Sequence, residues 1–429
     1  MQTPARVFDV ELSEPLPLID SPVRPDGSRY GGALVLIRLH GQPLGTLELD
    51  LSGGAADPAL VARLVWQKLQ APITDHLLRD GLPPACELGE AGLACDDVPS
   101  CRRFDDAASP FVSVVISTHE RPGPLAACIA SILRAEYPRF EVLVVDNAPR
   151  TATTREMVSQ RFGDDARVRY LLEPRPGASN GRNCGLWAAA GQVVVFVDDD
   201  VLVDRLWLRS LVLGFQAAPG VACVTGMILP AELETPSQVW IEEFGGFDKG
   251  FERKIFDLGE YAPPDPLFPY SVGKFGSGAS AAFDPTVLRA IGGFDTALGP
   301  ATPALGGEDL DAFLQIILAG HRLVYEPRSL VRHHHRREYA DLRRAVRGYG
   351  VGLAAVLTKA LMNPKTRADV LRRAPRGVAY FLNPASPKNE KKTSTFPRQL
   401  TLVEMGGALV GPVAYLRSRR WARTAGRAS

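Results

Sequence analysis

The chain has 429 residues, of which 45% are hydrophobic and 23% are charged, and its formal net charge is +1. This length exceeds that of one typical domain, so two or three structural units with a large buried core are expected. A near-neutral charge, without basic stretches interleaved with aromatic residues, argues against nucleic acid as a partner.

The sequence shows neither a secretory signal nor a membrane-spanning stretch. Its start, MQTPARVFDVELSEP, lacks a basic segment followed by an apolar one. The longest apolar candidate, Met405–Leu416, is too short to cross a bilayer. We therefore expect a cytoplasmic protein, either soluble or peripheral at the inner face of the plasma membrane.

Residues 1–110 are expected to form a small α+β accessory domain with a linker. Gly32–Ile37 and Gly45–Leu51 have the apolar patterning of short strands, and Pro58–Leu78 has apolar residues at helical spacing. Gly81–Asp106 is rich in Pro, Gly, Cys and Asp, as linkers are. No catalytic constellation is visible in this part of the sequence.

Three of the six cysteines, Cys86, Cys95 and Cys101, are close together in this linker. Six cysteines in so long a chain do not make a disulfide scaffold and suit a reducing compartment. The three could hold a metal, but they lack CxxC spacing and a histidine near them in the sequence. We therefore do not expect a zinc site there.

From Phe111 onwards, apolar strands alternate with amphipathic helices, which predicts βαβ units and a parallel sheet. Polar residues follow three of the expected strands: Thr118, Asp146 and the triplet Asp198–Asp200. In open α/β sheets ligands bind at the carboxyl ends of the strands, so these residues are expected to line one crevice. There is no GxGxxG after the first strand and no P-loop motif, which disfavours a dinucleotide site and a P-loop.

The aspartate triplet directly follows Val193–Val197, a short apolar run that fits a fully buried parallel strand. Three adjacent carboxylates repel one another unless a positive charge lies among them. A hard divalent cation would supply that charge and leave positions open for phosphate oxygens. The alternative is a solvated acidic turn that caps the next segment.

Seven segments between Phe111 and Lys359 together resemble the family-2 glycosyltransferases, which are inverting enzymes of the GT-A fold that use nucleotide sugars. The segments, in chain order, are VSVVISTHERP, VLVVDNA, RPGASNGRNCGLWAAAG, VVFVDDD, GGFD, GGEDLD and YEPRSLVRHHH. The resemblance implies an α/β fold with a GT-A-like, mostly parallel sheet flanked by helices over residues 111–337. A small β-containing N-terminal domain would precede it, and a basic helical region, 338–429, would follow.

The resemblance implies a nucleotide site at the first two strands. Thr118 and Arg121 would face the nucleotide, with a helix N-terminus carrying surface charge as the alternative. Asp146 would accept a hydrogen bond from N3–H of a uracil or thymine ring, with a turn-forming Asp-Asn pair as the alternative.

Five further residues would complete that site. Gly177, Arg182 and Asn183 match the family's loop near the nucleotide, where Arg182 would offset phosphate charge, hold an aspartate or form a structural salt bridge. Asp198 and Asp199 would contact the ribose and metal-bound water.

By the same resemblance, Asp200 would bind Mg²⁺ or Mn²⁺ directly. His333 is the most natural further ligand, but His334 and His335 leave that assignment uncertain by one or two residues. The three histidines and the arginines after them could instead form a basic phosphate-binding turn.

Inverting transfer also needs a carboxylate that takes the proton from the acceptor hydroxyl. The resemblance assigns this role to Asp309, with Glu308 as the alternative and Asp311 as a structural residue. All three could instead cap the helix that follows. Gly278 and Ala279 would let the donor sugar and the acceptor lie against the main chain.

Taken together, these features predict a metal-dependent inverting glycosyltransferase, similar to hexosyltransferases of polysaccharide biosynthesis. It would transfer a sugar from a UDP- or dTDP-sugar to a hydroxyl of a glycan, a lipid-linked sugar or a small molecule. A sugar nucleotidyltransferase and a non-catalytic carbohydrate-binding or scaffold protein are the alternatives. The stretch from Arg336 to Ser429 holds 20 Lys and Arg, so this region could contact an anionic membrane surface, or it could be a solvated face that packs on the catalytic domain.

Overall fold

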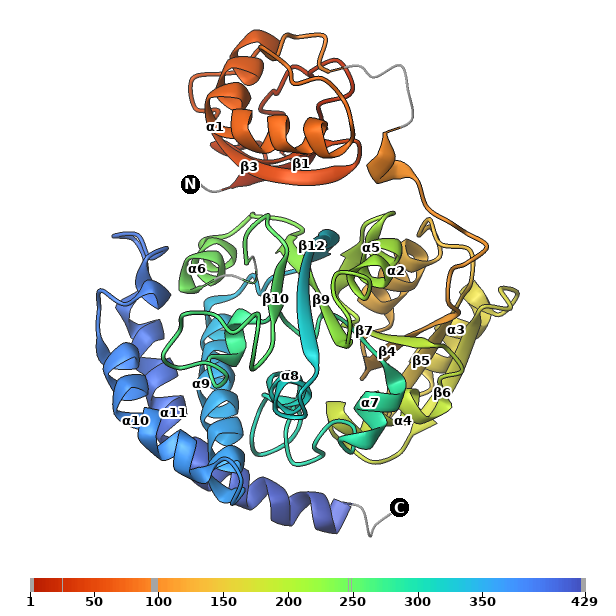
Figure 1. The fold of residues 1–429 in the computed structure, drawn as a ribbon, viewed down its shortest axis with the longest axis vertical. Coiled ribbons are helices and arrows are strands. Elements are labelled where there is room, and N and C mark those ends of the chain that lie inside the picture. Colours follow the sequence, from red (N-terminus) through yellow and green to blue (C-terminus); the bar gives the residue numbers. More distant parts are fainter. Residues whose placement is uncertain (1–3, 25, 94–98, 246, 248, 426–429) are drawn as a thin grey trace. The chain divides into compact units, whose positions relative to one another are not determined.

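The computed structural model describes residues 4–24, 26–93, 99–245, 247 and 249–425 (Figure 1). The chain divides into two compact units. The first unit is Met1–Ala108 together with Pro230–Ile241 and His334–Glu338, and the second is the remainder of the chain. Cys95 lies outside the described residues.

The first unit is a three-stranded sheet covered by one long helix. The sheet has the order β1-β2-β3, with β1 (Ala5–Glu11) parallel and β3 (Gln42–Asp50) antiparallel to β2 (Gly32–Leu39). The sequence predicted β2, β3 and the helix, α1 (Pro58–Arg79), but not β1. Helix α1 begins where the Asp57 carboxylate caps the Leu60 amide, and its apolar face is buried in the core of the unit.

The second unit is built on a mixed sheet with the order β10-β12-β9-β11-β7-β4-β5-β6, and β8 pairs with β12. Strands β7, β4, β5 and β6 are parallel, whereas β11 runs antiparallel to both β7 and β9. The strands are β4 (Val112–Thr118), β5 (Phe140–Asn147), β6 (Val168–Glu173), β7 (Val193–Val197), β8 (Val201–Val203), β9 (Val221–Pro230), β10 (Lys254–Phe256), β11 (Ser280–Phe283) and β12 (Arg322–His333).

Helices flank this sheet, as the α/β pattern predicted (Figure 1). Helix α4 packs on β4 and β5, and α5 packs on β12. All five residues of β7 are buried, which explains why the sequence there is an unbroken apolar run. The helices are α2 (Pro122–Ile132), α3 (Thr153–Phe162), α4 (Ala178–Ala188), α5 (Trp207–Gly214), α7 (Pro285–Ala290) and α8 (Glu308–Leu318). Helix α6 (Pro236–Phe244) begins in the segment that belongs to the first unit.

Three helices, α9 (Tyr339–Met362), α10 (Arg367–Leu382) and α11 (Arg398–Ala425), form the C-terminal region. Helices α9 and α11 approach so closely that a Cβ on Gly407 would lie 2.5 Å from the Arg347 carbonyl oxygen. Lys359 of α9 forms ion pairs with Asp311 (2.7 Å) and Asp295 (2.9 Å), which fasten α9 to the sheet unit. Asp311 therefore has the structural role that the sequence suggested.

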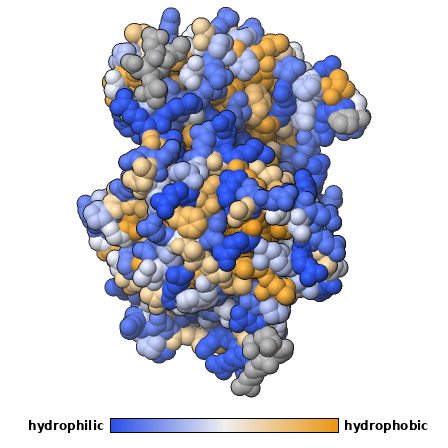
Figure 2. Space-filling view, turned by 90° about the vertical axis from the view of Figure 1, so that its right-hand side faces the viewer, coloured by the Kyte–Doolittle hydropathy of each residue, from blue (hydrophilic) through white to orange (hydrophobic). Residues whose placement is uncertain are grey.

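Short 3₁₀ turns complete the described chain: η1 (Ser100–Arg102), η2 (Val272–Lys274) and η3 (Pro387–Asn389). Within the described residues, none of the helices combines the length and the apolar character that crossing a bilayer requires. Figure 2 shows one face of the molecule, on which hydrophobic side chains are interspersed with hydrophilic ones, as on most protein surfaces.

Candidate active site

The aspartate triplet lies at the carboxyl end of β7, in the middle of the larger sheet. Two antiparallel pairings bring distant segments to this end. Ser280 of β11 pairs with Val197, so Gly278 and Ala279 immediately precede the strand that borders the triplet. His333 pairs with Val201, one residue after the triplet. The sheet thus brings Gly278, which is 80 positions after Asp198 (278 − 198), and His333, which is 135 positions after it (333 − 198), to the same end of the strands.

Thr118 and Arg121 both bind the triplet. The Thr118 hydroxyl donates to Oδ2 of Asp199 (2.6 Å), and the Arg121 guanidinium donates to Oδ1 of Asp199 (2.6 Å) and to Oδ2 of Asp200 (3.0 Å). Burial nevertheless raises the pKa of Asp199 to about 6, with the Arg121 charge opposing that rise. Arg121 thus places a positive charge between the carboxylates of Asp199 and Asp200. Part of its side chain remains exposed to solvent.

Arg182, from the second turn of α4, joins the triplet to the acidic start of α8. Its Nη2 donates to Asp198 (2.9 Å) and its Nη1 donates to Glu308 (2.6 Å). Both carboxylates raise the pKa of Arg182, outweighing the effect of its burial. Arg182 therefore both contacts an aspartate and forms a buried salt bridge, two of the roles that the sequence left open, and a role toward phosphate stays a prediction.

Glu308 and Asp309 are adjacent, but their surroundings differ. Glu308 is buried and paired with Arg182, and burial raises its pKa to about 7. Asp309 is partly exposed, and its Oδ2 accepts a hydrogen bond from the Gly278 amide (2.7 Å). A side chain at position 278 would collide with Asp309, because a Cβ there would lie 2.7 Å from the Asp309 Cβ. Gly278 is therefore required for this approach. Ala279 beside it is buried.

Among the three consecutive histidines that begin at residue 333, His333 lies against the aspartate triplet. Its Nε2 is 3.4 Å from Oδ1 of Asp200, whereas His334 is exposed to solvent. A separation of about 3 Å is typical of two ligand atoms bound to the same cation at about 2.1 Å. Asp200 is only 5% exposed, so its charge is poorly hydrated. The pair therefore fits a divalent cation of the kind that the sequence suggested.

Asp146, at the end of β5, is fully buried. Its Oδ2 accepts a hydrogen bond from the Tyr170 hydroxyl (2.9 Å), but its Oδ1 has no partner among the described residues. Burial raises the pKa of this carboxyl group. A buried acceptor without a donor is costly, so Oδ1 is suited to receive an N–H group from a ligand. Tyr170 was not identified from the sequence, because a tyrosine within a strand carries no pattern of its own.

Gly177 and Asn183 shape the loop segments near Arg182. Gly177 precedes α4 with φ of +110°, a conformation that glycine adopts readily. Asn183 uses its side-chain amide to donate to the Phe294 carbonyl and to accept from the Phe294 amide, each over 2.8 Å. Asn183 thus holds the loop that leads to α8, and its place near the nucleotide stays a prediction.

Comparison with known proteins relates part of this site to a known family. Residues 113–275 match the model of glycosyl transferase family 2. This segment of the chain is of the family-2 glycosyltransferase type. The resemblance seen in the sequence is thereby confirmed, and the sheet flanked by helices agrees with it.

Two curated relatives and one solved structure illustrate the similarity. The pre-mycofactocin glycosyltransferase of Mycobacterium tuberculosis is 33% identical over 63% of this chain and 52% of its own length. The GalNAc(5)-diNAcBac-PP-undecaprenol beta-1,3-glucosyltransferase of Campylobacter jejuni is 31% identical over 34% of this chain and 43% of its own length. The chain thus spans about half the length of these relatives. The mannosyltransferase PcManGT from Pyrobaculum calidifontis, solved with GDP-Man and Mn²⁺, is 21% identical, covers 75% of this chain and 86% of its own, and has a TM-score of 0.46.

Proposed function

We propose that this protein is a metal-dependent inverting glycosyltransferase that moves a sugar from a UDP- or dTDP-sugar to the hydroxyl of a glycan, lipid-linked or small-molecule acceptor. The observation that supports this most is the bridge through Arg182, which joins the acid cluster after β7 to the acidic start of α8. One side of the site can thus bind a sugar diphosphate while Asp309, on the other side, accepts a proton.

The donor would bind through the carboxyl ends of β4, β5 and β7. Asp146 Oδ1, buried and without a partner among the described residues, would accept the imide N3–H of uracil or thymine. Asp200 and His333 would hold Mg²⁺ or Mn²⁺, and Arg121 would keep Asp199 ionised and oriented. When bound, such a cation supplies Lewis-acid stabilisation of the departing nucleoside diphosphate.

Asp309 would act as the base. Its partly exposed carboxylate can reach an acceptor hydroxyl, whereas Glu308 is buried against Arg182. As the acceptor oxygen attacks the anomeric carbon, its proton would pass to Asp309, and the bond from that carbon to the diphosphate would break on the opposite face. The hydrogen bond from Gly278 would hold the Asp309 carboxylate in position for this transfer.

The C-terminal helices would bring the enzyme to an anionic membrane surface. Four leucines of these helices are exposed: Leu371 (56%) and Leu382 (55%) of α10, and Leu402 (65%) and Leu409 (83%) of α11. They stand among arginines of the same two helices. Apolar side chains together with positive charge favour binding at an anionic lipid surface. Such a location would suit a lipid-linked acceptor.

Product analysis tests the proposal. The full chain is incubated with Mn²⁺, a panel of UDP-, dTDP- and GDP-sugars and glycan, lipid-linked and small-molecule acceptors, and in a parallel reaction with sugar phosphates and nucleoside triphosphates. Thermal stability and released products are measured. We expect stabilisation by a UDP- or dTDP-sugar and release of the nucleoside diphosphate. Release of pyrophosphate from a sugar phosphate and a nucleoside triphosphate would identify a nucleotidyltransferase instead, and carbohydrate binding without any release would identify a non-catalytic protein.

A further inference from the structure

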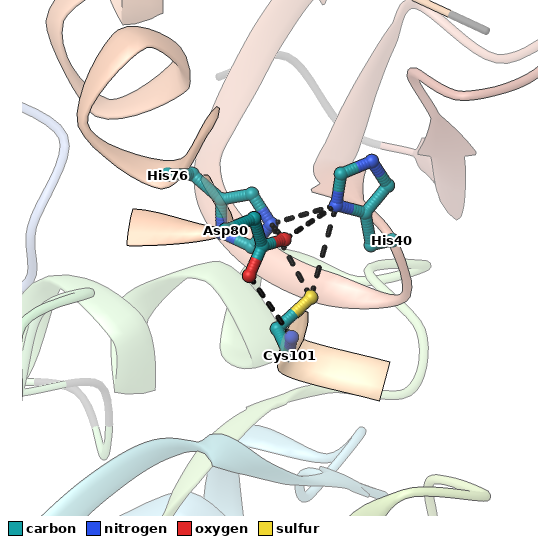
Figure 3. A group of neighbouring side chains, drawn as sticks. All are labelled: His40, His76, Asp80 and Cys101. Carbon is teal, nitrogen blue, oxygen red and sulfur yellow. Dashed lines mark hydrogen bonds and ion pairs between the residues drawn. The ribbon is translucent and has the colours of Figure 1, made fainter. Parts of the chain in front are cut away.

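Four potential metal ligands converge in the first unit, far in sequence from the triplet. Figure 3 shows the side chains of His40, His76, Asp80 and Cys101 pointing toward one another. One ligand atom from each residue can be chosen so that all four atoms lie within 4.8 Å of one another. His40, His76 and Asp80 are almost completely buried. This group takes no part in the proposed sugar transfer.

The four residues come from three separate segments. His40 occupies the two-residue turn between β2 and β3, with φ of +56°, which histidine adopts more readily than most residues. His76 and Asp80 are four residues apart at the end of α1 and therefore lie on the same face. Cys101 lies in η1, near the end of the linker. No local sequence pattern indicates this group, because its ligands are up to 61 positions apart.

The distances among the ligand atoms match a tetrahedral site. His40 Nδ1 is 3.1 Å from His76 Nε2 and 2.9 Å from Asp80 Oδ2, and His76 Nε2 is 3.3 Å from the same oxygen. Cys101 Sγ is 3.7 Å from both ring nitrogens. Around a zinc ion, a tetrahedron has nitrogen or oxygen atoms about 3.3 Å apart and sulfur about 3.6 Å from either, given the usual bond lengths.

Hydrogen bonds alone account poorly for this arrangement. A ring nitrogen of histidine carries at most one proton, directed along one line in the ring plane. His40 Nδ1 nevertheless has three polar neighbours, His76 Nε2, Asp80 Oδ2 and Cys101 Sγ. One proton can serve only one of them. A cation at the centre would satisfy all four ligand atoms at once.

The surrounding hydrogen bonds orient the ligands. Oδ1 of Asp80 accepts from the Ser100 hydroxyl and the Cys101 amide, each over 2.9 Å, which turns Oδ2 toward the histidines. The Glu11 carboxylate accepts from the His40 amide (2.8 Å) and the Gly41 amide (2.7 Å), and so fixes the turn that carries His40. Partners of this kind are typical of built metal sites.

We propose that His40, His76, Asp80 and Cys101 bind a structural Zn²⁺ ion in the first unit. Imidazole and thiolate ligands in a tetrahedral arrangement favour zinc over Mg²⁺ or Mn²⁺. Four protein ligands leave no open position, so the ion fastens Cys101 to α1 and to the β2–β3 turn and does not take part in catalysis. The Cys101 thiol releases its proton when the ion binds.

Metal analysis and cobalt spectroscopy of the full chain, prepared without a polyhistidine tag, test this proposal. We expect about one zinc ion per chain. After replacement by Co²⁺, the protein should show the strong visible bands of a tetrahedral site and a thiolate-to-cobalt charge-transfer band. A chain without stoichiometric zinc, or with cobalt bands that lack the thiolate contribution, would overturn the proposal and leave a metal-free hydrogen-bonded cluster.

Variants assign the bands to this site. Cys101→Ser should remove the charge-transfer band, and His76→Ala should lower the zinc content at least about tenfold. Cys86→Ser, at an exposed cysteine, should change neither measurement. Asp200→Asn should also retain zinc, since Asp200 belongs to the candidate active site and is not one of the four zinc ligands. A charge-transfer band that persists in Cys101→Ser would refute the assignment. The cobalt spectrum of the unaltered chain tests the proposal even if a variant fails to fold.

Discussion

The Gly278 amide donates a hydrogen bond to the Asp309 carboxylate over 2.7 Å, which joins the turn before β11 to the first turn of α8. These two residues are separated by 31 positions. The contact orients the proposed base through the main chain, and its Oδ1 likewise accepts from the Leu310 amide over 2.8 Å. A single methyl group added at position 278 would displace Asp309.

Asp309→Asn tests the base directly. We expect binding of the nucleotide sugar to be unchanged and transfer to fall about 10³-fold, because an amide cannot accept the proton. Single-turnover kinetics and calorimetry with the donor measure the two effects separately. Turnover equal to that of the wild type would exclude Asp309 as the base.

Gly278→Ala should displace Asp309, since the added Cβ would lie 2.7 Å from the Asp309 Cβ. We expect kcat to fall at least about tenfold, as small misplacements of a catalytic group are costly, with a smaller change in donor affinity. Gly273→Ala is the matched control, because a Cβ at that position meets nothing within 4 Å. Equal activity of the two variants would argue against a role for the Gly278–Asp309 contact.

Asp200 and His333 should determine how nucleotide binding depends on the metal. In calorimetry with UDP and Mn²⁺, we expect Asp200→Asn to lose most of the affinity and His333→Ala to lose about 10- to 100-fold, the range found when a metal site is impaired. EDTA should abolish the affinity of the wild type. His334→Ala, at the exposed neighbour, is the control. An affinity for UDP that is unchanged by EDTA would show that Asp200 is not a metal ligand.

Glu308 should make stability depend on pH. Its pKa in the folded state is raised to about 7 from the usual 4.5, so between these values the folded protein binds more protons than the unfolded one. The contribution of Glu308 to stability is therefore present below about pH 4.5 and is lost as the pH rises toward 7. Urea unfolding should show the stability of the wild type falling relative to Glu308→Gln over this interval. Glu156→Gln, at an exposed carboxylate of α3, is the control, and the stability of the wild type should not fall relative to this variant over the same interval. Parallel curves of unfolding free energy against pH for the wild type and Glu308→Gln would contradict the prediction.

The exposed leucines of α10 and α11 should contribute to membrane binding. Leu409 is 83% exposed, so we expect Leu409→Ser to weaken binding to anionic vesicles by up to about thirtyfold, since burying a leucine contributes about 2 kcal/mol. Leu172→Ser, at a leucine of β6 that is 57% exposed, is the control. Equal binding to anionic and neutral vesicles, or none to either, would count against a membrane-bound enzyme.

The sequence by itself indicated the succession of strands and helices from β4 to β7 and the carboxylates that follow the strands. Val193–Val197 is apolar because both faces of β7 are buried, and Asp198–Asp200 follow where that strand must end. Periodicity and composition are local properties, so a chain read in order reveals them. The family resemblance, carried by several such segments, followed for the same reason.

Only the tertiary structure decided which distant residues meet. Arg182 joins Asp198 and Glu308, Tyr170 takes one oxygen of Asp146, and Asn183 binds the Phe294 loop, none of which a local pattern encodes. The same holds for Cys101, which had no histidine near it in the sequence and has two beside it in the fold. Such contacts depend on how strands pair and helices pack, and those interactions join positions that are far apart along the chain.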